Sequence, residues 1–354
     1  MKRIVLTIMA VAALAACTKS EVQYETPGEI GFAPAVENLT KAAMPAGDLA
    51  STQKLNVWAY WDQDGDVEDE VDSYADYATT FLDEATFAQK TVNGTTAWGG
   101  DGVAYPWPVN GALVFSGYTT PTSAETAANG YDVTYTLSSD AMVFTNYTQS
   151  SNTASTFDLC WFNHTVGSHN NKTSGQAVDV TLSHALTWIT IKAYGVGTPV
   201  AKGSEWRIKS IKLKEVETIG TGTCVGAGVD KATWTNLSGT SDITVYAPNA
   251  PTNIPADATA LETNLNGTVV IPQTPTLMEV VFDYPVGGNR VEETVLVNLT
   301  LAGSKDEDGK NNAEISKWQS GVHYTYTLAF KGNEILVAPS YGEWGTDDRT
   351  VTVE

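Results

Sequence analysis

From about residue 50 onward, apolar and polar residues alternate along most of the chain, and this pattern restricts the fold more than any other feature. The clearest run places Val178, Val180 and Leu182 on one face of an extended segment. Runs rich in Val, Tyr, Phe and Thr, bounded by Gly, Pro, Asn and Asp, recur at residues 55–60, 112–118, 131–137, 141–147, 206–216, 242–247, 268–271, 278–284, 293–301, 323–330, 334–337 and 350–353. Alternation with period two is typical of strands. The sequence therefore predicts an all-β fold.

Two segments depart from simple alternation. In the run 178–193 the apolar positions change parity at Ile189, which we interpret as a bulge within one strand. Residues 72–89 carry Tyr74, Tyr77 and Phe81 at near-helical spacing, so a short helix is expected there.

The length of 354 residues suggests two domains. Residues 163–176 are rich in Asn and Gly and contain no long apolar run, as expected of a linker or surface loop. We place the boundary near residue 175, giving units at 42–174 and 175–354. The number of strands and the regular spacing of turns favour two β-sandwiches in series.

The N-terminus has the pattern of a bacterial lipoprotein signal. Lys2 and Arg3 precede an apolar run at 4–14, and small residues then lead directly to Cys17. Residues 1–16 are expected to be removed as a signal peptide, with Cys17 acylated as the anchor of the mature chain. Thr18, rather than Asp, follows the cysteine and indicates export to the outer membrane.

Net charge limits the possible partners, and the cysteine count limits the possible disulfides. The formal charge is −21, so nucleic acid is excluded as a natural partner. Besides Cys17, the chain has Cys160 and Cys224, which form either one disulfide or two buried thiols.

Catalytic and metal-binding spacings are missing from the sequence, so no catalytic residue, metal or cofactor is predicted. His164 and His169 lie in a polar loop, and His184 lies within an alternating strand as a core histidine would. The acidic stretches 62–70 and 306–309 lack the register of a calcium-binding loop and are expected to be solvated turns.

One aromatic stretch leaves two interpretations open. Trp98, Tyr105 and Trp107 lie among glycines and prolines. They either pack beneath a sheet or form an exposed platform that binds glycans, in which case the protein would be a monomeric surface lipoprotein.

Several segments, in this order, resemble the fimbrillin family, the type V pilins of anaerobic Gram-negative bacteria. The segments are Cys17, Ile30-Gly31-Phe32, Thr40-Lys41-Ala42, 55–61, 98–115, Asp158-Leu159, Leu182-Ser183-His184-Ala185-Leu186, and Trp318-x-x-Gly321-x-x-Tyr324-x-Tyr326-x-Leu328 followed by Ile335 and Trp344.

The resemblance implies two transthyretin-like β-sandwiches in series in a structural, non-enzymatic subunit of a cell-surface fimbrium that supports adhesion. Residues 17–41 would be a propeptide whose strand, with Ile30, Phe32 and Val36, fills a groove until a trypsin-like protease at the outer membrane cuts at Lys41-Ala42. An extended segment of another pilin subunit would then fill the groove.

Two points about this implied maturation stay open. The family usually has Arg before the cut, so Lys41 means either that the protease accepts Lys or that this subunit stays uncleaved as an anchor or accessory subunit. The tail 334–354, with Ile335, Val337, Val351 and Val353, is either the donated strand or a terminal strand of its own sandwich.

Overall fold

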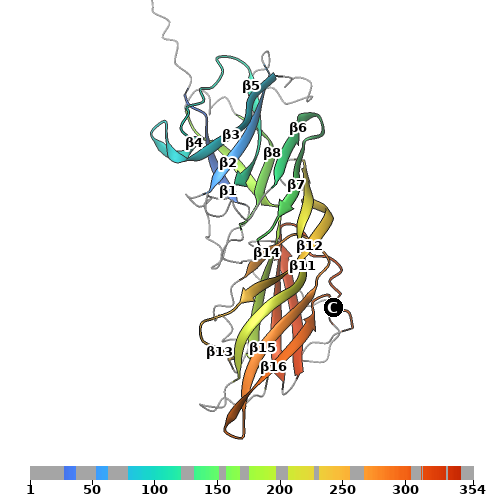
Figure 1. Ribbon diagram of the computed structural model, residues 1–354. Helices are drawn as coiled ribbons and strands as arrows, with labels where there is room; N and C mark the ends of the chain where they lie inside the picture. Colours follow the sequence, from blue (N-terminus) through green and yellow to red (C-terminus); the bar gives the residue numbers. More distant parts are fainter. Residues whose placement is uncertain are drawn as a thin grey trace, which may run out of the picture.

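The computed structural model is an elongated, nearly all-β molecule with a barrel at one end and two stacked sheets at the other (Figure 1). It describes residues 28–36, 53–62, 79–120, 131–150, 157–167, 175–196, 206–226, 231–255, 267–303, 312, 314–331 and 334–343. The predicted all-β fold is confirmed: the one helical element among these residues is a 3₁₀ turn, Leu137–Ser139. None of them forms a helix long and apolar enough to cross a membrane.

Seven strands close the barrel. In order around it they are β1 (Gly31–Val36), β4 (Thr95–Gly100), β3 (Thr79–Val92), β2 (Lys54–Asp62), β5 (Ala112–Thr120), β8 (Cys160–Val166) and β9 (Val178–His184). Alternation along β2 explains how its residues serve two cores. Leu55 and Val57 point into the barrel, whereas Trp58 points outward and stacks on Tyr118. Both faces of this part of the barrel are therefore buried.

The remaining strands form two sheets, which enclose a second core at the end of the molecule away from the barrel. The first sheet contains β14 (Thr268–Val270), β10 (Thr187–Gly195), β17 (Val322–Lys331) and β18 (Glu334–Glu343). The second contains β16 (Asn289–Asn298), β15 (Leu277–Val286), β11 (Arg207–Val225), β7 (Ala141–Thr148) and β6 (Asp132–Thr136), with β12 (Thr233–Tyr246) and β13 (Thr252–Asn253) also paired to β11. Trp318 is fully buried in this core, and its indole N–H donates to the Tyr326 hydroxyl at 2.8 Å.

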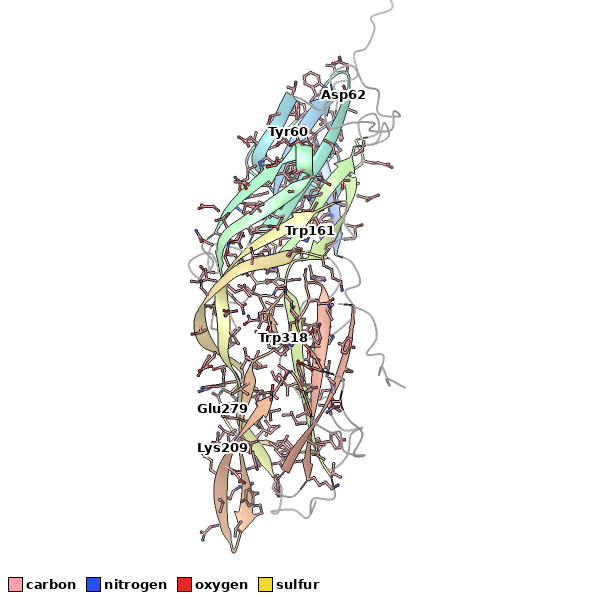
Figure 2. The ribbon with its side chains drawn as sticks, turned by 90° about the vertical axis from the view of Figure 1, so that its right-hand side faces the viewer. Tyr60, Asp62, Trp161, Lys209, Glu279 and Trp318 are labelled. Carbon is pink, nitrogen blue, oxygen red and sulfur yellow. The ribbon has the colours of Figure 1, made fainter. Side chains whose placement is uncertain are left out.

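The long strand β11 joins the two ends. Its first part pairs with β15, and its last part pairs with β7, which lies beside the barrel. A third core forms there between the outer face of the barrel and β7, β11 and β12; it contains Trp161, Met142 and Trp234. Figure 2 shows Trp161 near the middle of the molecule and Trp318 in its lower half.

The segment predicted as one bulged strand at 178–193 is two strands in different sheets. β9 ends at His184 in the barrel and β10 begins at Thr187 in the four-stranded sheet, so the chain crosses between the two ends at Ala185 and Leu186. The change of parity at Ile189 marked this crossing and not a bulge. Because the residues on both sides of it are buried, alternation alone does not distinguish the two cases.

The helix expected within 72–89 is wrong for its described part, because β3 begins at Thr79. Glu84 has a φ of 50°, and the register between β2 and β3 shifts nearby, at Val57 to Ala59. This bulge breaks the alternation of β3. Tyr74 and Tyr77, which carried most of the helical spacing, lie outside the described residues.

The division into units at 42–174 and 175–354 stays a prediction, and strand pairing bears on it in two ways. β9 lies after residue 175 and still belongs to the barrel, whereas β7 lies before it and pairs with β11. Cys160 and Cys224 are both buried free thiols, so of the two alternatives left by the sequence the structure has the thiols.

Candidate functional site

The N-terminal strand β1 closes the barrel and is paired unequally on its two sides. On one side it runs parallel to β9, from Phe32 opposite Val178 to Val36 opposite Leu182. On the other it pairs with β4 through two residues, Gly31 and Phe32. Beyond Phe32, β1 is therefore held mainly by β9 among the described strands.

One face of β1 is buried inside the barrel. Ile30 and Phe32 are completely buried, whereas Ala33 and Ala35 are exposed. The Phe32 ring lies edge-on to Phe87 and Phe115, with ring centroids 4.9 and 5.1 Å away, and 6.2 Å from the tilted ring of Phe162. These three rings come from β3, β5 and β8. Phe32 is thus a central contact between β1 and the rest of the barrel.

Polar contacts hold the residues that lead into β1. The side chain of Asn93 donates to the carbonyl of Glu29 at 3.1 Å and to that of Gly175 at 2.7 Å, and the Glu29 N–H donates to the Asn93 Oδ1 at 3.4 Å. Asn93 and Gly94 both have positive φ and form the two-residue turn between β3 and β4, which suits Asn-Gly. The turn places one amide across both β1 and the segment before β9.

Further contacts surround the same segment. Lys90 forms an ion pair of 2.5 Å with Glu29, and its ammonium also donates to the carbonyl of Gly100. The Ile30 N–H donates to the Tyr105 carbonyl at 2.8 Å. The start of β1 is therefore fixed by β3, β4 and the loop that follows β4.

At the other end of the chain, β18 is the edge strand of the four-stranded sheet. It pairs with β17 over ten residue pairs, from Val322 opposite Glu343 to Lys331 opposite Glu334. Val337 is buried in the second core, which also contains Trp318, and Ile335 packs against this core. Residues 334–343 are therefore a strand of their own sheet in this structure.

The structure describes some of the predicted site residues and not others. It places Ile30 and Phe32 in the barrel interior and the backbone of Val36 opposite Leu182. The remaining predicted residues lie outside the described residues: Cys17, Lys41, Ala42, Val351 and Val353.

The aromatic stretch is packed and forms no exposed platform. Trp98 and Trp107 are 5% and 3% exposed, and Trp107 lies edge-on to Phe115 inside the barrel. Tyr105 packs on Phe87. The glycan-binding alternative based on these three side chains is therefore wrong, because two of them are inaccessible from the surface.

The described residues thus form an all-β fold with a closed barrel whose aromatic side chains are packed inside. A family model described as fimbrillin-like matches residues 40–344, and the chain belongs to this family. Membership makes the protein a fimbrial subunit of the cell surface with a structural role. A search among curated proteins returned no match.

Several solved structures also resemble this chain, at low sequence identity. A candidate cell adhesion protein from Bacteroides uniformis is 13% identical, with 90% of this chain and 98% of that chain covered and a TM-score of 0.49. A fimbrial protein from Bacteroides vulgatus is 14% identical, with 89% and 99% covered and a TM-score of 0.47. The tip fimbrial protein Mfa3 from Porphyromonas gingivalis, truncated at its C-terminus, is 11% identical, with 83% and 94% covered and a TM-score of 0.34.

Proposed function

We propose that this protein is a fimbrial subunit whose barrel is closed by its own strand β1 before maturation and by a strand of another subunit afterwards. The observation that carries the proposal is the position of β1, which is the first described strand, closes the barrel between β9 and β4, and buries Ile30 and Phe32. Because β1 precedes every other described strand, a single cut between β1 and β2 would detach it from all of them.

Loss of β1 would leave a groove that favours another strand. Unpaired N–H and C=O groups would be exposed along β9, where five residues now pair with β1, and along the end of β4. The rings that surround Phe32 would also meet water. Burying a Phe or Ile side chain contributes about 1.5–3 kcal/mol. A donated strand with apolar residues at alternate positions would therefore be held both by main-chain hydrogen bonds and by burial of those side chains.

The predicted cut at Lys41-Ala42 fits this arrangement. β1 ends at Val36 and β2 begins at Lys54, so the cut falls between two strands and removes no residue from any other described element. Once it is made, β1 is held to the barrel by non-covalent contacts alone.

The same cut would also release the subunit from the membrane. We propose that Cys17 carries the lipid anchor of an outer-membrane precursor, as the signal sequence indicates. Because Cys17 and β1 both precede Lys41, one cleavage by a trypsin-like protease separates the mature barrel from its anchor and from its own closing strand. Detachment and competence to assemble are then produced together.

We further propose that the donor comes from the C-terminal segment 334–354. Since β18 already makes ten residue pairs with β17, donation of residues 334–343 would cost the subunit an edge strand of its own. Donation of the residues after 343, including Val351 and Val353, would leave that sheet intact. We therefore favour the last part of the tail as the donated strand.

The test is to express the full chain and its variants at a cell surface and apply limited trypsin. The wild type is expected to yield an N-terminus at Ala42 and a ladder of SDS-resistant oligomers, whereas Lys41→Ala is expected to stay monomeric and lipid-anchored. Lys209→Ala is the matched control, because Lys209 is an exposed lysine of β11 far from β1. Deleting residues 345–354 should give cleaved protein that polymerises poorly. Filaments that assemble from Lys41→Ala with β1 still attached would refute the mechanism.

A further inference from the structure

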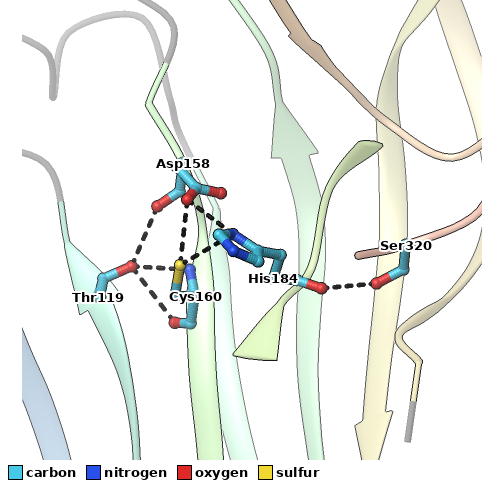
Figure 3. Close-up of polar contacts among 5 residues, drawn as sticks. All are labelled: Thr119, Asp158, Cys160, His184 and Ser320. Atoms are coloured by element: carbon cyan, nitrogen blue, oxygen red, sulfur yellow. Dashed lines mark hydrogen bonds and ion pairs between the residues drawn. The ribbon is translucent and has the colours of Figure 1, made fainter. Parts of the chain in front are cut away.

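Three side chains of types that can bind metals, Asp158, Cys160 and His184, lie together in a cluster near Ala185 and Leu186, where the chain passes from the barrel to the four-stranded sheet (Figure 3). The imidazole Nδ1 of His184 is 2.8 Å from Oδ2 of Asp158, and the sulfur of Cys160 is 3.3 Å from the same oxygen and 3.6 Å from Nδ1. Cys160 and His184 are opposite each other in the pairing of β8 with β9. Asp158 lies two residues before Cys160, the first residue of β8, so the strand register brings all three together.

The backbone around the cluster is fixed from two sides. The Thr119 hydroxyl on β5 accepts from the Cys160 N–H at 2.8 Å and lies 3.3 Å from the carbonyl oxygens of Asp158 and Cys160. On the other side, the Ser320 hydroxyl donates to the His184 carbonyl at 2.7 Å (Figure 3). The three side chains therefore project from a rigid frame.

Nucleophilic catalysis does not fit this arrangement. In a catalytic triad the imidazole uses one nitrogen for the nucleophile and the other for the acid. Here Nδ1 of His184 faces both the sulfur and the carboxylate. The thiol of Cys160 is 2% exposed, and burial together with Asp158 raises its pKa well above the ordinary value. A substrate would find neither access nor a thiolate.

The spacing does fit a tetrahedral metal ion. With a Zn–S distance of about 2.3 Å and Zn–N and Zn–O distances of about 2.0–2.1 Å, tetrahedral ligand atoms lie roughly 3.3–3.6 Å apart. The three distances observed are 2.8, 3.3 and 3.6 Å. The ion would be admitted if His184 and Asp158 moved apart by about half an ångström and the sulfur by less. A second carboxylate oxygen is also available, because Oδ1 of Asp158 is buried without a hydrogen-bond partner among the described residues.

We propose that Asp158, Cys160 and His184 bind Zn²⁺ or a divalent ion of similar softness. Zinc accepts thiolate sulfur, imidazole nitrogen and carboxylate oxygen as ligands, whereas calcium and magnesium prefer oxygen alone. On binding, the Cys160 thiol releases its proton to solvent and a sulfur–metal bond forms. His184 binds through Nδ1 in the tautomer that carries its proton on Nε2. One carboxylate, one thiolate and a dication sum to zero charge, which suits a buried site.

The ion would fasten β8 to β9 where the chain leaves the barrel. β9 is also the strand that pairs with β1 over five residues. The ion would therefore stabilise one wall of the groove whether or not β1 is in place, and the proposal does not depend on strand exchange.

The test uses the full chain, treated with chelator and then given Co²⁺ or Zn²⁺ alone. One equivalent of Co²⁺ should produce the thiolate charge-transfer band and the intense visible bands of tetrahedral cobalt. Cys160→Ser should lose the charge-transfer band, and Cys224→Ser should keep it, since Cys224 is equally buried and outside the cluster. Zn²⁺ at about a hundredfold excess over its dissociation constant should raise the melting temperature by roughly 5 °C in the wild type and Cys224→Ser, and not in Asp158→Asn or His184→Gln.

A measurement on the wild type keeps the proposal testable should the variants fold poorly. X-ray absorption at the zinc edge should show one sulfur neighbour and two or three nitrogen or oxygen neighbours. A spectrum with oxygen neighbours alone would mean adventitious binding by the acidic surface and would overturn the proposal. So would a folded wild type that takes up no Co²⁺, or a charge-transfer band that survives in folded Cys160→Ser.

Discussion

Phe32 gives the sharpest test of how β1 is held. The side chain is completely buried and packs edge-on against two rings from β3 and β5 in the barrel interior. Replacing a buried Phe by Ala costs about 3–5 kcal/mol, from lost burial and from the cavity that remains. Edge-to-face pairs are worth about 0.5–1.5 kcal/mol each beyond burial, which favours the upper part of that range. We therefore expect Phe32→Ala to lower the free energy of unfolding of the uncut chain by about 4 kcal/mol.

The consequence is larger for function once the chain is cut at Lys41. β1 is then a separate peptide, and about 4 kcal/mol corresponds to a weakening of its binding by roughly a thousandfold. The measurement is retention of the 17–41 fragment after trypsin, followed by gel filtration and mass spectrometry, alongside denaturant unfolding of the uncut protein. Ala33→Ser is the matched control, because Ala33 is the next residue and is exposed. Equal retention and equal unfolding midpoints for the two variants would refute the reasoning.

Three further predictions concern other contacts. Asn93→Ala removes the amide that spans the start of β1 and the segment before β9, so the cut fragment should dissociate about ten- to a hundredfold faster, measured by the same retention assay; an unchanged rate would show that the amide does not hold β1. The hydrogen bond from Arg207 lowers the pKa of Asp283 below its unfolded value of about 3.9. The stability that ionised Asp283 contributes to the fold is therefore complete above about pH 4, and it is lost as the pH falls through the lower folded pKa. Asp283→Asn should therefore reduce the loss of stability below about pH 4 in denaturant titrations, and an identical acid profile would contradict this. Burial raises the pKa of the Cys160 and Cys224 thiols, so in the chelator-treated protein neither should react with a thiol reagent until denaturant is added, when both should; no reaction in denaturant would indicate a disulfide.

The all-β fold could be predicted because alternation is a direct consequence of strand geometry. The crossing at Ala185 and Leu186 could not, since strands buried on both faces give the same pattern on either side of a sheet change. The buried face of β1 was also accessible from sequence, because Ile30 and Phe32 have the period of two. Its partner strands were not, because β9 lies about 145 residues further along and only the fold brings the two together.

The cluster at Asp158, Cys160 and His184 shows the same limit for a site. The sequence separates the cysteine from the histidine by 24 residues, and a histidine inside an alternating strand is most often a core residue. The available signal was Asp-x-Cys at the start of one strand and His at the end of the next. Antiparallel neighbours bring such ends together, so pairing β8 with β9 in the right register would have revealed the cluster.

If strand exchange takes place as proposed, the place of β1 in the barrel explains why this strand, and not another, is the one exchanged. The barrel order is β1-β4-β3-β2-β5-β8-β9, so β1 lies between strands that are distant from it in sequence and makes no hairpin with β2. Every other barrel strand has described strands before and after it and would need two cuts to leave. A single cut between Val36 and Lys54 frees β1 and leaves the other six strands connected in their order. The opened barrel then has two edges, β9 and β4, that one extended segment can bridge. Under the proposed mechanism, such a subunit would keep its groove closed until proteolysis, which would prevent premature association through exposed strand edges.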